Sequence, residues 1–527
     1  MEGQCFMKIK TGLDNRRVAL NIIFGCIAYG TNAFISLVIT PYITSKLGAE
    51  AYGFVKLAND FASYGSLVTL ALNSMASRFI MLKNEQGDKE AARSYYTSIT
   101  IANVILSLVL LLPTILIVLG INTIFNVPVE MIQDVRWAFI WTLSNFLICL
   151  AGTTFGNCFF IKNRLDVSSI LTSITSILRA IFIICAFMLV GPKISVMAFG
   201  SIIVTAVFLP CNIYFHKKLT PELYFDKKTF DIYKVLEVLS SGIWNSITKL
   251  SQILMTGLDL TITNLLLGAL KMGYLSVAKT IPNFVSSLIN AIGNSFTPNM
   301  MKIYANGDKE GLKTAVKTSM RIMTIFATVP NAILISLGVE FYRLWVPGQP
   351  IQLINVLSII TVIGTCVLGP MQPIYQIFTL TNKIRQSSII FIIEGIMSIL
   401  ITIFSVKSLG GGLYAVAGVS VILEIVVALT YHLPVGASYI DLPWYTFFPE
   451  IGKTIIILVM QCIIGKVVSF VNPVGNLWIN WIIDGMAIGI LGMTITLFFV
   501  LNKEERNELI GIICNKIIRR PAMKSQV

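Results

Sequence analysis

The sequence predicts an all-α polytopic membrane protein with about fourteen transmembrane helices, built as two parallel six-helix repeats followed by two further helices. Composition is the first observation behind this prediction. Of the 527 residues, 55% are hydrophobic and 13% are charged, and the mean hydropathy is +0.79. Soluble globular domains carry about 25% charged residues, so this chain is too apolar for that class. The other two observations are a series of apolar runs and an internal duplication.

Apolar runs long enough to cross a bilayer recur along the whole chain. A transmembrane helix needs about 20 such residues, because roughly 30 Å of hydrocarbon is crossed at 1.5 Å per residue. Fourteen runs meet this requirement. They are 18–40, 52–76, 97–120, 135–158, 168–190, 195–215, 240–267, 274–297, 319–339, 354–380, 387–406, 411–433, 451–471 and 478–501.

The basic residues follow the positive-inside rule. With the N-terminus placed in the cytoplasm, the inside segments hold 29 Lys and Arg and the outside segments hold 5. Cytoplasmic loops of membrane proteins carry such an excess of basic residues. The formal net charge of +14 therefore reports membrane topology, and no nucleic-acid partner is expected. The same count predicts that both termini lie in the cytoplasm.

One stretch, residues 47–98, recurs without a gap at 267–318. Its apolar pattern continues in step between the shared landmarks, although identity there is low. Chance similarity of two apolar helices would not place the same polar tetrapeptide in register. The repeated landmarks are Leu-Gly-Ala at 47–49 and 267–269, Gly53 and Gly273, and Gly-Asp-Lys-Glu at 87–90 and 307–310.

The duplication divides the chain into two halves. Six expected helices, an even number, separate the two copies, so the copies share one orientation across the membrane. A second echo, at nearly the same offset, relates Ser168 and Ser169 to Ser387 and Ser388. We therefore expect an N-terminal lobe over 1–220, a C-terminal lobe over 221–440, and two additional helices with a basic cytoplasmic tail over 441–527.

Charged residues inside the expected spans are the main candidates for function. A charge in the bilayer centre costs about 2.5–3.5 kcal/mol on insertion scales, so each one needs a partner, an aqueous cavity or a role in transport. The helices around the duplicated stretch are also rich in Ser, Thr and Asn, and cannot face lipid on all sides. We expect them to line a central cavity in which the cations meet an anionic ligand. The candidate substrate-binding residues are Lys56, Asp60, Arg179, Asn245, Lys249, Gln252, Lys279 and Asn283.

Structural roles remain open for several of these charges. Lys56 and Asp60 are four positions apart on one helix face and could neutralise each other. Lys249 could extend to the membrane interface, and Lys279 could lie near a helix end. The acidic residues within spans are either ion-coupling groups or structural pairs, and the sequence does not decide between them. The ion-coupling candidates are Asp259, Glu394 and Glu424.

Signatures of catalysis are close to absent. The two histidines, His216 and His432, lie at expected helix ends, where boundary residues are commoner than acid–base catalysts. Cysteine and histidine spacings show no metal-binding pattern. We therefore expect no catalytic residue, no metal and no cofactor, and we expect that the protein is not an enzyme.

The helix arrangement and two short motifs resemble a known family. The motifs are Leu-Gly-x-x-x-x-Gly at 47–53, which opens the second span, and the Gly-Asp-x-Glu loop that follows it. With twelve core helices in two repeats and two extra helices, they are similar to the polysaccharide-export branch of the multidrug/oligosaccharidyl-lipid/polysaccharide superfamily. That branch includes the Wzx-type O-antigen flippases and is related to the multidrug exporters of the MATE group.

The resemblance implies a function and a set of partners. It implies a V-shaped transporter with two lobes in a bacterial cytoplasmic (inner) membrane. By alternating access this transporter would move an undecaprenyl-diphosphate-linked oligosaccharide to the outer leaflet, for cell-surface polysaccharide or O-antigen synthesis. Implied partners are the lipid-linked oligosaccharide, membrane lipids, H⁺ or Na⁺, and polysaccharide polymerase and chain-length proteins. The alternatives are a cation-coupled multidrug exporter, which would want an acidic pocket, and a membrane-embedded glycosyltransferase or polymerase, which would need larger outer loops.

Overall fold

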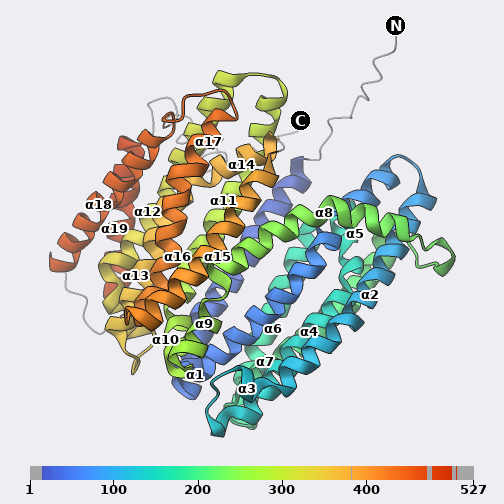
Figure 1. Ribbon diagram of the computed structural model, residues 1–527, viewed down its shortest axis with the longest axis horizontal. Helices are drawn as coiled ribbons and strands as arrows, with labels where there is room; N and C mark the ends of the chain where they lie inside the picture. The colour runs from blue at the N-terminus through green and yellow to red at the C-terminus, as the bar shows by residue number, and fades with distance from the viewer. Residues whose placement is uncertain (1–14, 382, 472–477, 501–505, 507–527) are drawn as a thin grey trace, which may run out of the picture. The chain divides into compact units, whose positions relative to one another are not determined.

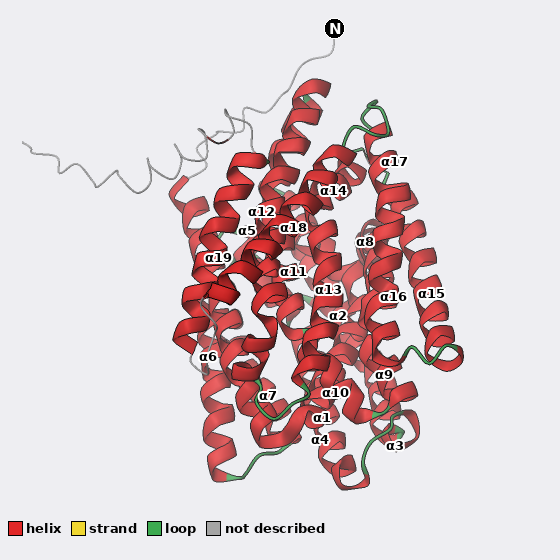
Figure 2. Ribbon diagram, turned by 90° about the vertical axis from the view of Figure 1, so that its left-hand side faces the viewer, coloured by secondary structure: helices red, strands yellow, loops and turns green. Residues whose placement is uncertain are grey.

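The computed structural model describes residues 15–381, 383–471, 478–500 and 506, and these residues form helices joined by short loops (Figures 1 and 2). The all-α prediction is therefore confirmed for the described part of the chain. In hydrocarbon every backbone polar group must be satisfied inside the protein, and the α-helix satisfies its own groups within one segment. Runs rich in Leu, Ile, Val and Ala supply the apolar surface that such helices present to lipid.

Eleven described helices are long and apolar enough to cross a membrane, or twelve if the bent pair Val129–Ala151 and Thr153–Ile161 is one span. The chain is thus a multi-pass membrane protein with fewer candidate spans than the fourteen expected runs. Two features account for the difference. The first two runs lie in the single element α1 (Asn15–Glu85), in which two helices meet at the non-helical residue Gly48, and the polar helix Thr280–Ala305 is not among the candidates.

Two compact units make up the fold, and the first consists of residues up to Ile253 together with Leu260–Gly273. In this unit α1 packs along both α6 and α8, and α4 packs on α7. Its elements are α1 (Asn15–Glu85), α2 (Lys89–Leu119), α3 (Ile121–Ile124), η1 (Val129–Met131), α4 (Ile132–Ala151), η2 (Thr153–Gly156), α5 (Asn157–Ile161), α6 (Leu165–Leu189), α7 (Ile194–Leu219), η3 (Lys227–Thr229), α8 (Ile232–Gln252), and parts of α9 (Asp259–Leu267) and α10 (Ala269–Ala278).

The second unit consists of Leu254–Asp259 and of the chain from Tyr274 onward. Its central element is α12, which packs on α11, α13, α18 and α19. The elements are the π-helical turn η4 (Ile253–Gly257), α11 (Thr280–Ala305), α12 (Lys309–Trp345), α13 (Ile351–Leu368), η5 (Gly369–Met371), α14 (Gln372–Leu380), α15 (Ile384–Ser408), α16 (Gly412–Val427), η6 (Ala428–His432), α17 (Leu433–Ser438), α18 (Phe448–Val471) and α19 (Trp478–Phe499).

Helix boundaries repeat between the units at the offset of the second sequence echo. The block α4–η2–α5 covers Ile132–Ile161, and the block α13–η5–α14 covers Ile351–Leu380. The first residues of the two blocks, and also their last residues, are separated by the same number of positions as Ser168 and Ser387. The same offset relates both ends of α6 to those of α15. Each half therefore contains an interrupted helix followed by a continuous helix, at equivalent places in the chain.

The repeated Gly-Asp-Lys-Glu tetrapeptide forms the same turn in both copies. Gly87 and Gly307 have φ angles of 83° and 72°, a left-handed conformation that glycine adopts without steric cost after a helix. Asp88 and Asp308 then cap the next helix, each accepting a hydrogen bond from the backbone N–H three positions later, at 2.9 and 2.8 Å. The glycine ends one helix and the aspartate begins the next, which explains why this polar sequence occurs in both copies.

The equivalent glycines Gly53 and Gly273 lie against each other in the first unit. A Cβ atom on Gly53 would lie 3.0 Å from the Cα of Gly273. A Cβ on Gly273 would lie 2.5 Å from the backbone carbonyl of Ala49. The two copies of Leu-Gly-x-x-x-x-Gly therefore bring their backbones together, and small residues permit such close packing of membrane helices.

Substituting Gly273 with Ala is expected to lower the free energy of unfolding by about 1–3 kcal/mol, the usual cost of overpacking a well-packed site. The atoms that must move belong to the backbone at Ala49, so side-chain rotation cannot relieve the clash. Thermal unfolding in detergent measures the effect. Gly452→Ala is the matched control, because a Cβ at Gly452 meets nothing within 4 Å; equal midpoints for the two variants would contradict the prediction.

Candidate functional site

Lys279 and Asp259 form a buried ion pair in the second unit. The Nζ of Lys279 donates a hydrogen bond to Oδ2 of Asp259, and their side chains are 13% and 7% exposed. Asp259 begins α9 just after the π-helical turn η4, and Lys279 lies between α10 and α11. Burial of two charges is tolerated when each neutralises the other. Both were predicted site residues, but their partnership was not predicted.

Three predicted residues of α8 share one helix face in the first unit. Asn245, Lys249 and Gln252 are spaced by four and three positions, which places them in one row. Asn245 donates a hydrogen bond of 3.0 Å to the Ser74 hydroxyl of α1. Lys249 is partly buried and Gln252 is exposed. One end of this row, Asn245, therefore contacts α1, and the other end, Gln252, has an exposed side-chain amide.

Lys56 and Asp60 lie one turn apart on α1, and both are partly buried. The Nζ of Lys56 lies 5.3 Å from the ring centroid of Tyr52, within the range of a cation–π contact. The Tyr52 hydroxyl is in turn 3.2 Å from the hydroxyl of Thr40 on the same helix. The aromatic ring thus holds the Lys56 ammonium at a defined place along α1.

Arg179 lies in the middle of α6, a helix apolar enough to span a membrane. Its Nε is buried, and no residue in the described part of the chain accepts a hydrogen bond from it. One turn earlier, the Ser176 hydroxyl donates a 2.7 Å hydrogen bond to Asn32 of α1. Arg179 therefore lies in a helix of the bundle, and its Nε–H group has no hydrogen-bond acceptor among the described residues.

Glu394 and Glu424 lie in the second unit, on the adjacent helices α15 and α16. Glu394 is only 4% exposed, and among the described residues neither of its carboxylate oxygens has a hydrogen-bond partner. Glu424 is partly buried. Glu394 is thus a buried acidic group whose carboxylate oxygens no described side chain satisfies.

A buried histidine of the second unit, His432, lies among aromatic side chains that were not predicted as site residues. His432 is 1% exposed and stacks on Phe391 with ring centroids 4.4 Å apart, and Tyr375 meets it edge-on at 5.3 Å. Neither ring nitrogen of His432 has a partner among the residues that the structure describes. Helical periodicity assigns Tyr375 and Phe391 to packing, so only their contacts with the buried His432 mark them.

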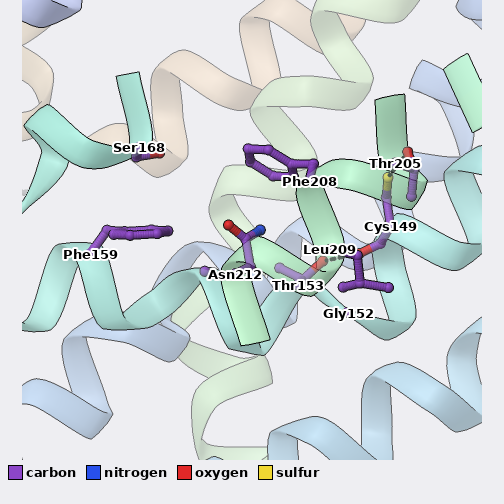
Figure 3. A pocket seen from close by; sticks show the side chains of 10 residues that line it. Cys149, Gly152, Thr153, Phe159, Ser168, Thr205, Phe208, Leu209 and Asn212 are labelled. Carbon is purple, nitrogen blue, oxygen red and sulfur yellow. Dashed lines mark hydrogen bonds between the residues drawn. The ribbon is translucent and has the colours of Figure 1, made fainter. Parts of the chain in front are cut away.

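A cavity of about 270 Å³ lies in the first unit where α4 ends and η2 begins (Figure 3). Its walls come from α4, η2, α5, α6 and α7, and they are mainly apolar with a few hydroxyl and amide groups. Gly156 contributes to this space, since a Cβ there would meet nothing within 4 Å. The lining residues are Cys149, Gly152, Thr153, Gly156, Phe159, Ser168, Thr205, Phe208, Leu209 and Asn212.

The predicted site residues therefore fall into separate groups. The structure joins Lys279 to Asp259 and places Glu394 and Glu424 on the adjacent helices α15 and α16. Asn283 is exposed on α11, and its backbone N–H bonds to the carbonyl of Lys279. The first unit holds Lys56, Asp60, Arg179, Asn245, Lys249 and Gln252, whereas the second holds Asp259, Lys279, Asn283, Glu394 and Glu424.

Comparison with solved structures shows a shared fold. The chain is similar to the lipid II flippase MurJ in an inward closed conformation, with a TM-score of 0.64 and 16% identity over 95% of this chain and 100% of that one. It is also similar to an inward-facing multidrug resistance MATE family transporter of the MOP superfamily, with a TM-score of 0.62 and 17% identity over 80% of this chain and 98% of that one. The chain thus shares the fold of these two transporters.

Sequence comparison identifies the family. The chain is 26% identical over 493 residues to the uncharacterized membrane protein EpsK of Bacillus subtilis (strain 168), covering 93% of this chain and 97% of the relative. The family model described as "Polysaccharide biosynthesis protein" matches residues 18–304, which is more than half of the chain. The predicted resemblance is confirmed: this chain belongs to the polysaccharide biosynthesis protein family, with the fold of the MOP superfamily transporters.

Proposed function

We propose that this protein is a flippase for a polyprenyl-diphosphate-linked oligosaccharide, which it moves from the inner to the outer leaflet for cell-surface polysaccharide or O-antigen synthesis. The observation that carries the proposal is Arg179, a guanidinium in a spanning helix whose buried Nε lacks an acceptor among the described residues. An intramembrane charge is costly and is usually retained for a function. Guanidinium groups bind phosphate oxygens through paired, charge-assisted hydrogen bonds.

Other residues of the first unit suit the remaining parts of this ligand. Lys56 and Lys249 are partly buried cations and would add charge for the second phosphate. Asn245 and Gln252 offer amide donors and acceptors for sugar hydroxyls, and Asp60 offers an acceptor. Lys279 is already neutralised by Asp259, so we assign that pair a role in holding the second unit together before any role in phosphate binding.

The transport cycle we propose is alternating access by two lobes, 1–220 and 221–440, with two additional helices in 441–527. Fourteen spans follow if α1 crosses twice and the α10–α11 segment crosses once. An even number of spans places both termini on the same side of the membrane, and the excess of basic residues in the loops on that side assigns it to the cytoplasm. Family membership and a fold shared with a lipid II flippase support this assignment.

Replacing Arg179 with Gln is expected to abolish surface polysaccharide in cells that depend on this protein, and to make the lipid-linked precursor accumulate inside. Arg179→Lys is expected to retain partial export, because Lys keeps the charge but loses the paired geometry. Immunoblots of surface polysaccharide and mass spectrometry of extracted lipids measure both effects.

The matched control for Arg179 is Arg343→Gln, since Arg343 is exposed at the end of α12. Membrane levels of all three variants are compared by immunoblot, so that loss of protein is not mistaken for loss of export. Normal surface polysaccharide in the Arg179→Gln variant would contradict the proposal. Export of a lipophilic cationic dye without movement of the lipid-linked saccharide would favour a cation-coupled multidrug exporter instead.

A further inference from the structure

A buried amide group faces the cavity of the first unit without a hydrogen-bond donor. Asn212 of α7 is 5% exposed, and its Oδ1 atom has no partner among the residues that the structure describes. Figure 3 shows its side chain pointing into the space between Phe159 and Phe208. A buried acceptor without a donor is energetically unfavourable, so a molecule that donates a hydrogen bond to Oδ1 would bind favourably here.

The cavity forms where the chain bends and carries two glycines. The helix axis turns by 58° between Val129–Ala151 and Thr153–Ile161. A Cβ on Gly152 would lie 2.3 Å from Cδ1 of Leu209 on α7, whereas a Cβ on Gly156 would meet nothing within 4 Å. The close approach of α7 at Gly152 thus fixes one side of the cavity, and the missing side chain of Gly156 leaves its volume free.

The second unit carries large side chains at the equivalent positions. At the offset shared by the helix boundaries, Gly152 corresponds to Met371 and Gly156 to Tyr375. Met371 is 0% exposed and belongs to a hydrophobic core cluster, and the Tyr375 ring meets His432 edge-on at 5.3 Å. The repeated fold therefore does not require glycine at these positions, and both glycines occur in the half that has this cavity.

The walls favour an uncharged ligand with one polar end. None of the described lining residues is charged. The Thr205 hydroxyl already donates 2.5 Å to Asn145 Oδ1, and the Thr153 hydroxyl donates 2.9 Å to the Cys149 carbonyl. A buried water molecule makes about three hydrogen bonds, which a mainly apolar wall does not offer. A hydroxyl group on a carbon chain can donate to Asn212 and place its chain against the aromatic rings.

Size and surroundings indicate that this ligand is part of a membrane lipid. The volume of about 270 Å³ exceeds that of an apolar cavity of about 150 Å³ that binds benzene, so it accommodates a hydroxyl group with several methylene groups. Exposed apolar side chains adjoin lining residues in the sequence: Phe160 is 48% exposed, Leu165 42% and Val207 39%. Such surfaces on membrane helices contact lipid chains, and the rest of the ligand can extend among them.

We propose that this cavity binds the hydroxyl end of an uncharged lipid alcohol, with Asn212 accepting its hydrogen bond and Phe159 and Phe208 packing on its carbon chain. The site is separate from the residues proposed to bind diphosphate, because Arg179 lies about 16 Å along α6 from the lining residue Ser168. Binding of this lipid does not rest on the proposed flippase function.

Photoaffinity labelling of the full-length protein in phosphatidylcholine vesicles tests the site, because this lipid has no hydroxyl group of its own. The probe is a long-chain alcohol with a diazirine on the carbon chain close to the hydroxyl. Its matched partner is the methyl ether of the same alcohol, which cannot donate a hydrogen bond. We expect the alcohol to label peptides that contain Phe159 or Phe208 at about tenfold lower concentration than the ether, the effect of one hydrogen bond to a buried acceptor.

Three variants test where the probe binds. Asn212→Leu keeps the size of the side chain and removes the acceptor, so the alcohol is expected to label no better than the ether. Gly156→Phe fills the cavity and is expected to lower labelling by both probes at least tenfold. The matched control is Gly452→Phe, on α18 of the second unit, where a Cβ also meets nothing within 4 Å. Its labelling is expected to equal that of the wild type.

Competition distinguishes a lipid alcohol from other sources of the same group. Dioleoylglycerol, an uncharged lipid with one hydroxyl, is expected to displace the probe. Glycerol, which is soluble, and phosphatidic acid, in which a charged phosphate replaces that hydroxyl, are expected not to displace it at the same concentration. Displacement by either of these two compounds would overturn the proposal.

The wild type alone can also refute the site, since equal labelling by the alcohol and the ether would overturn the proposal without any variant. A preference for the alcohol that survives in Asn212→Leu, or labelling that survives in Gly156→Phe, would do the same. Thermal unfolding in detergent checks that each variant is folded before its labelling is compared.

Discussion

Replacing Lys279 with Met is expected to lower the free energy of unfolding by about 3–5 kcal/mol, the usual result of removing one partner from a buried ion pair. The Asp259 carboxylate is 7% exposed and bonds to the Lys279 ammonium, so the variant leaves a negative charge in the protein interior without that counter-charge. Unfolding titrations in detergent micelles, followed by tryptophan fluorescence, measure the loss. Asp259→Leu is expected to destabilise the protein similarly.

Two further variants make this prediction specific. The double variant Lys279→Met/Asp259→Leu is expected to recover most of the lost stability, because replacing a buried ion pair by apolar side chains is often neutral. Lys309→Met removes an exposed pair, with Asp441, whose side chains are 65% and 71% exposed, and is expected to cost at most about 1 kcal/mol. A double variant no more stable than the singles would contradict the role given to this pair.

Glu450→Gln is expected to have an effect of similar size on the attachment of α18 to α12. Arg321 of α12 donates to both carboxylate oxygens of Glu450, at 3.1 and 2.9 Å, and the two side chains are 11% and 4% exposed. The hydroxyl groups of Thr324 and Thr454 add a 2.8 Å contact beside them. Neutralising Glu450 leaves the Arg321 guanidinium nearly buried without its bidentate partner, at a cost of about 3–5 kcal/mol.

Limited proteolysis and thermal unfolding in detergent measure this second effect. Digestion after α17 is expected to release a fragment containing α18 and α19 earlier from Glu450→Gln than from the wild type. The control is Lys313→Met, which breaks an i, i+3 pair with Glu310, a residue 76% exposed, and is expected to change stability by less than about 1 kcal/mol. Equal midpoints for Glu450→Gln and Lys313→Met would refute the anchoring role.

Local sequence patterns predicted much of the fold. Apolar runs marked the helices, and the Gly-Asp-Lys-Glu repeat marked turns that Gly87 and Gly307 form with left-handed φ angles. The count of candidate spans is lower because two helices that meet at the non-helical residue Gly48 form the single element α1, and the break between the first two apolar runs lies at this kink. The contact of Gly53 with Gly273 depends on tertiary packing, which one-dimensional periodicity does not report.

The site was predicted only as a set of unusual residues. An intramembrane charge is visible in sequence, so Arg179, Lys279, Asp259, Glu394 and Glu424 could be named. Their partners could not, because Lys279 and Asp259 lie on different elements and meet through the π-helical turn η4 and the short helices after it. Aromatic residues such as Tyr375 could not be named either, because nothing in the sequence distinguishes them from ordinary packing residues.

Transbilayer movement of the lipid in vesicles tests the proposed flippase function most directly. The purified protein is reconstituted with a fluorescent polyprenyl-diphosphate-linked oligosaccharide, and a membrane-impermeant reductant reports the fraction of label that reaches the outer leaflet. Nearly all label is expected to become reducible with the wild type, and only the initial outer-leaflet share with Arg179→Gln. Failure of the wild type to move the lipid, or equal movement by Arg179→Gln, would contradict that function.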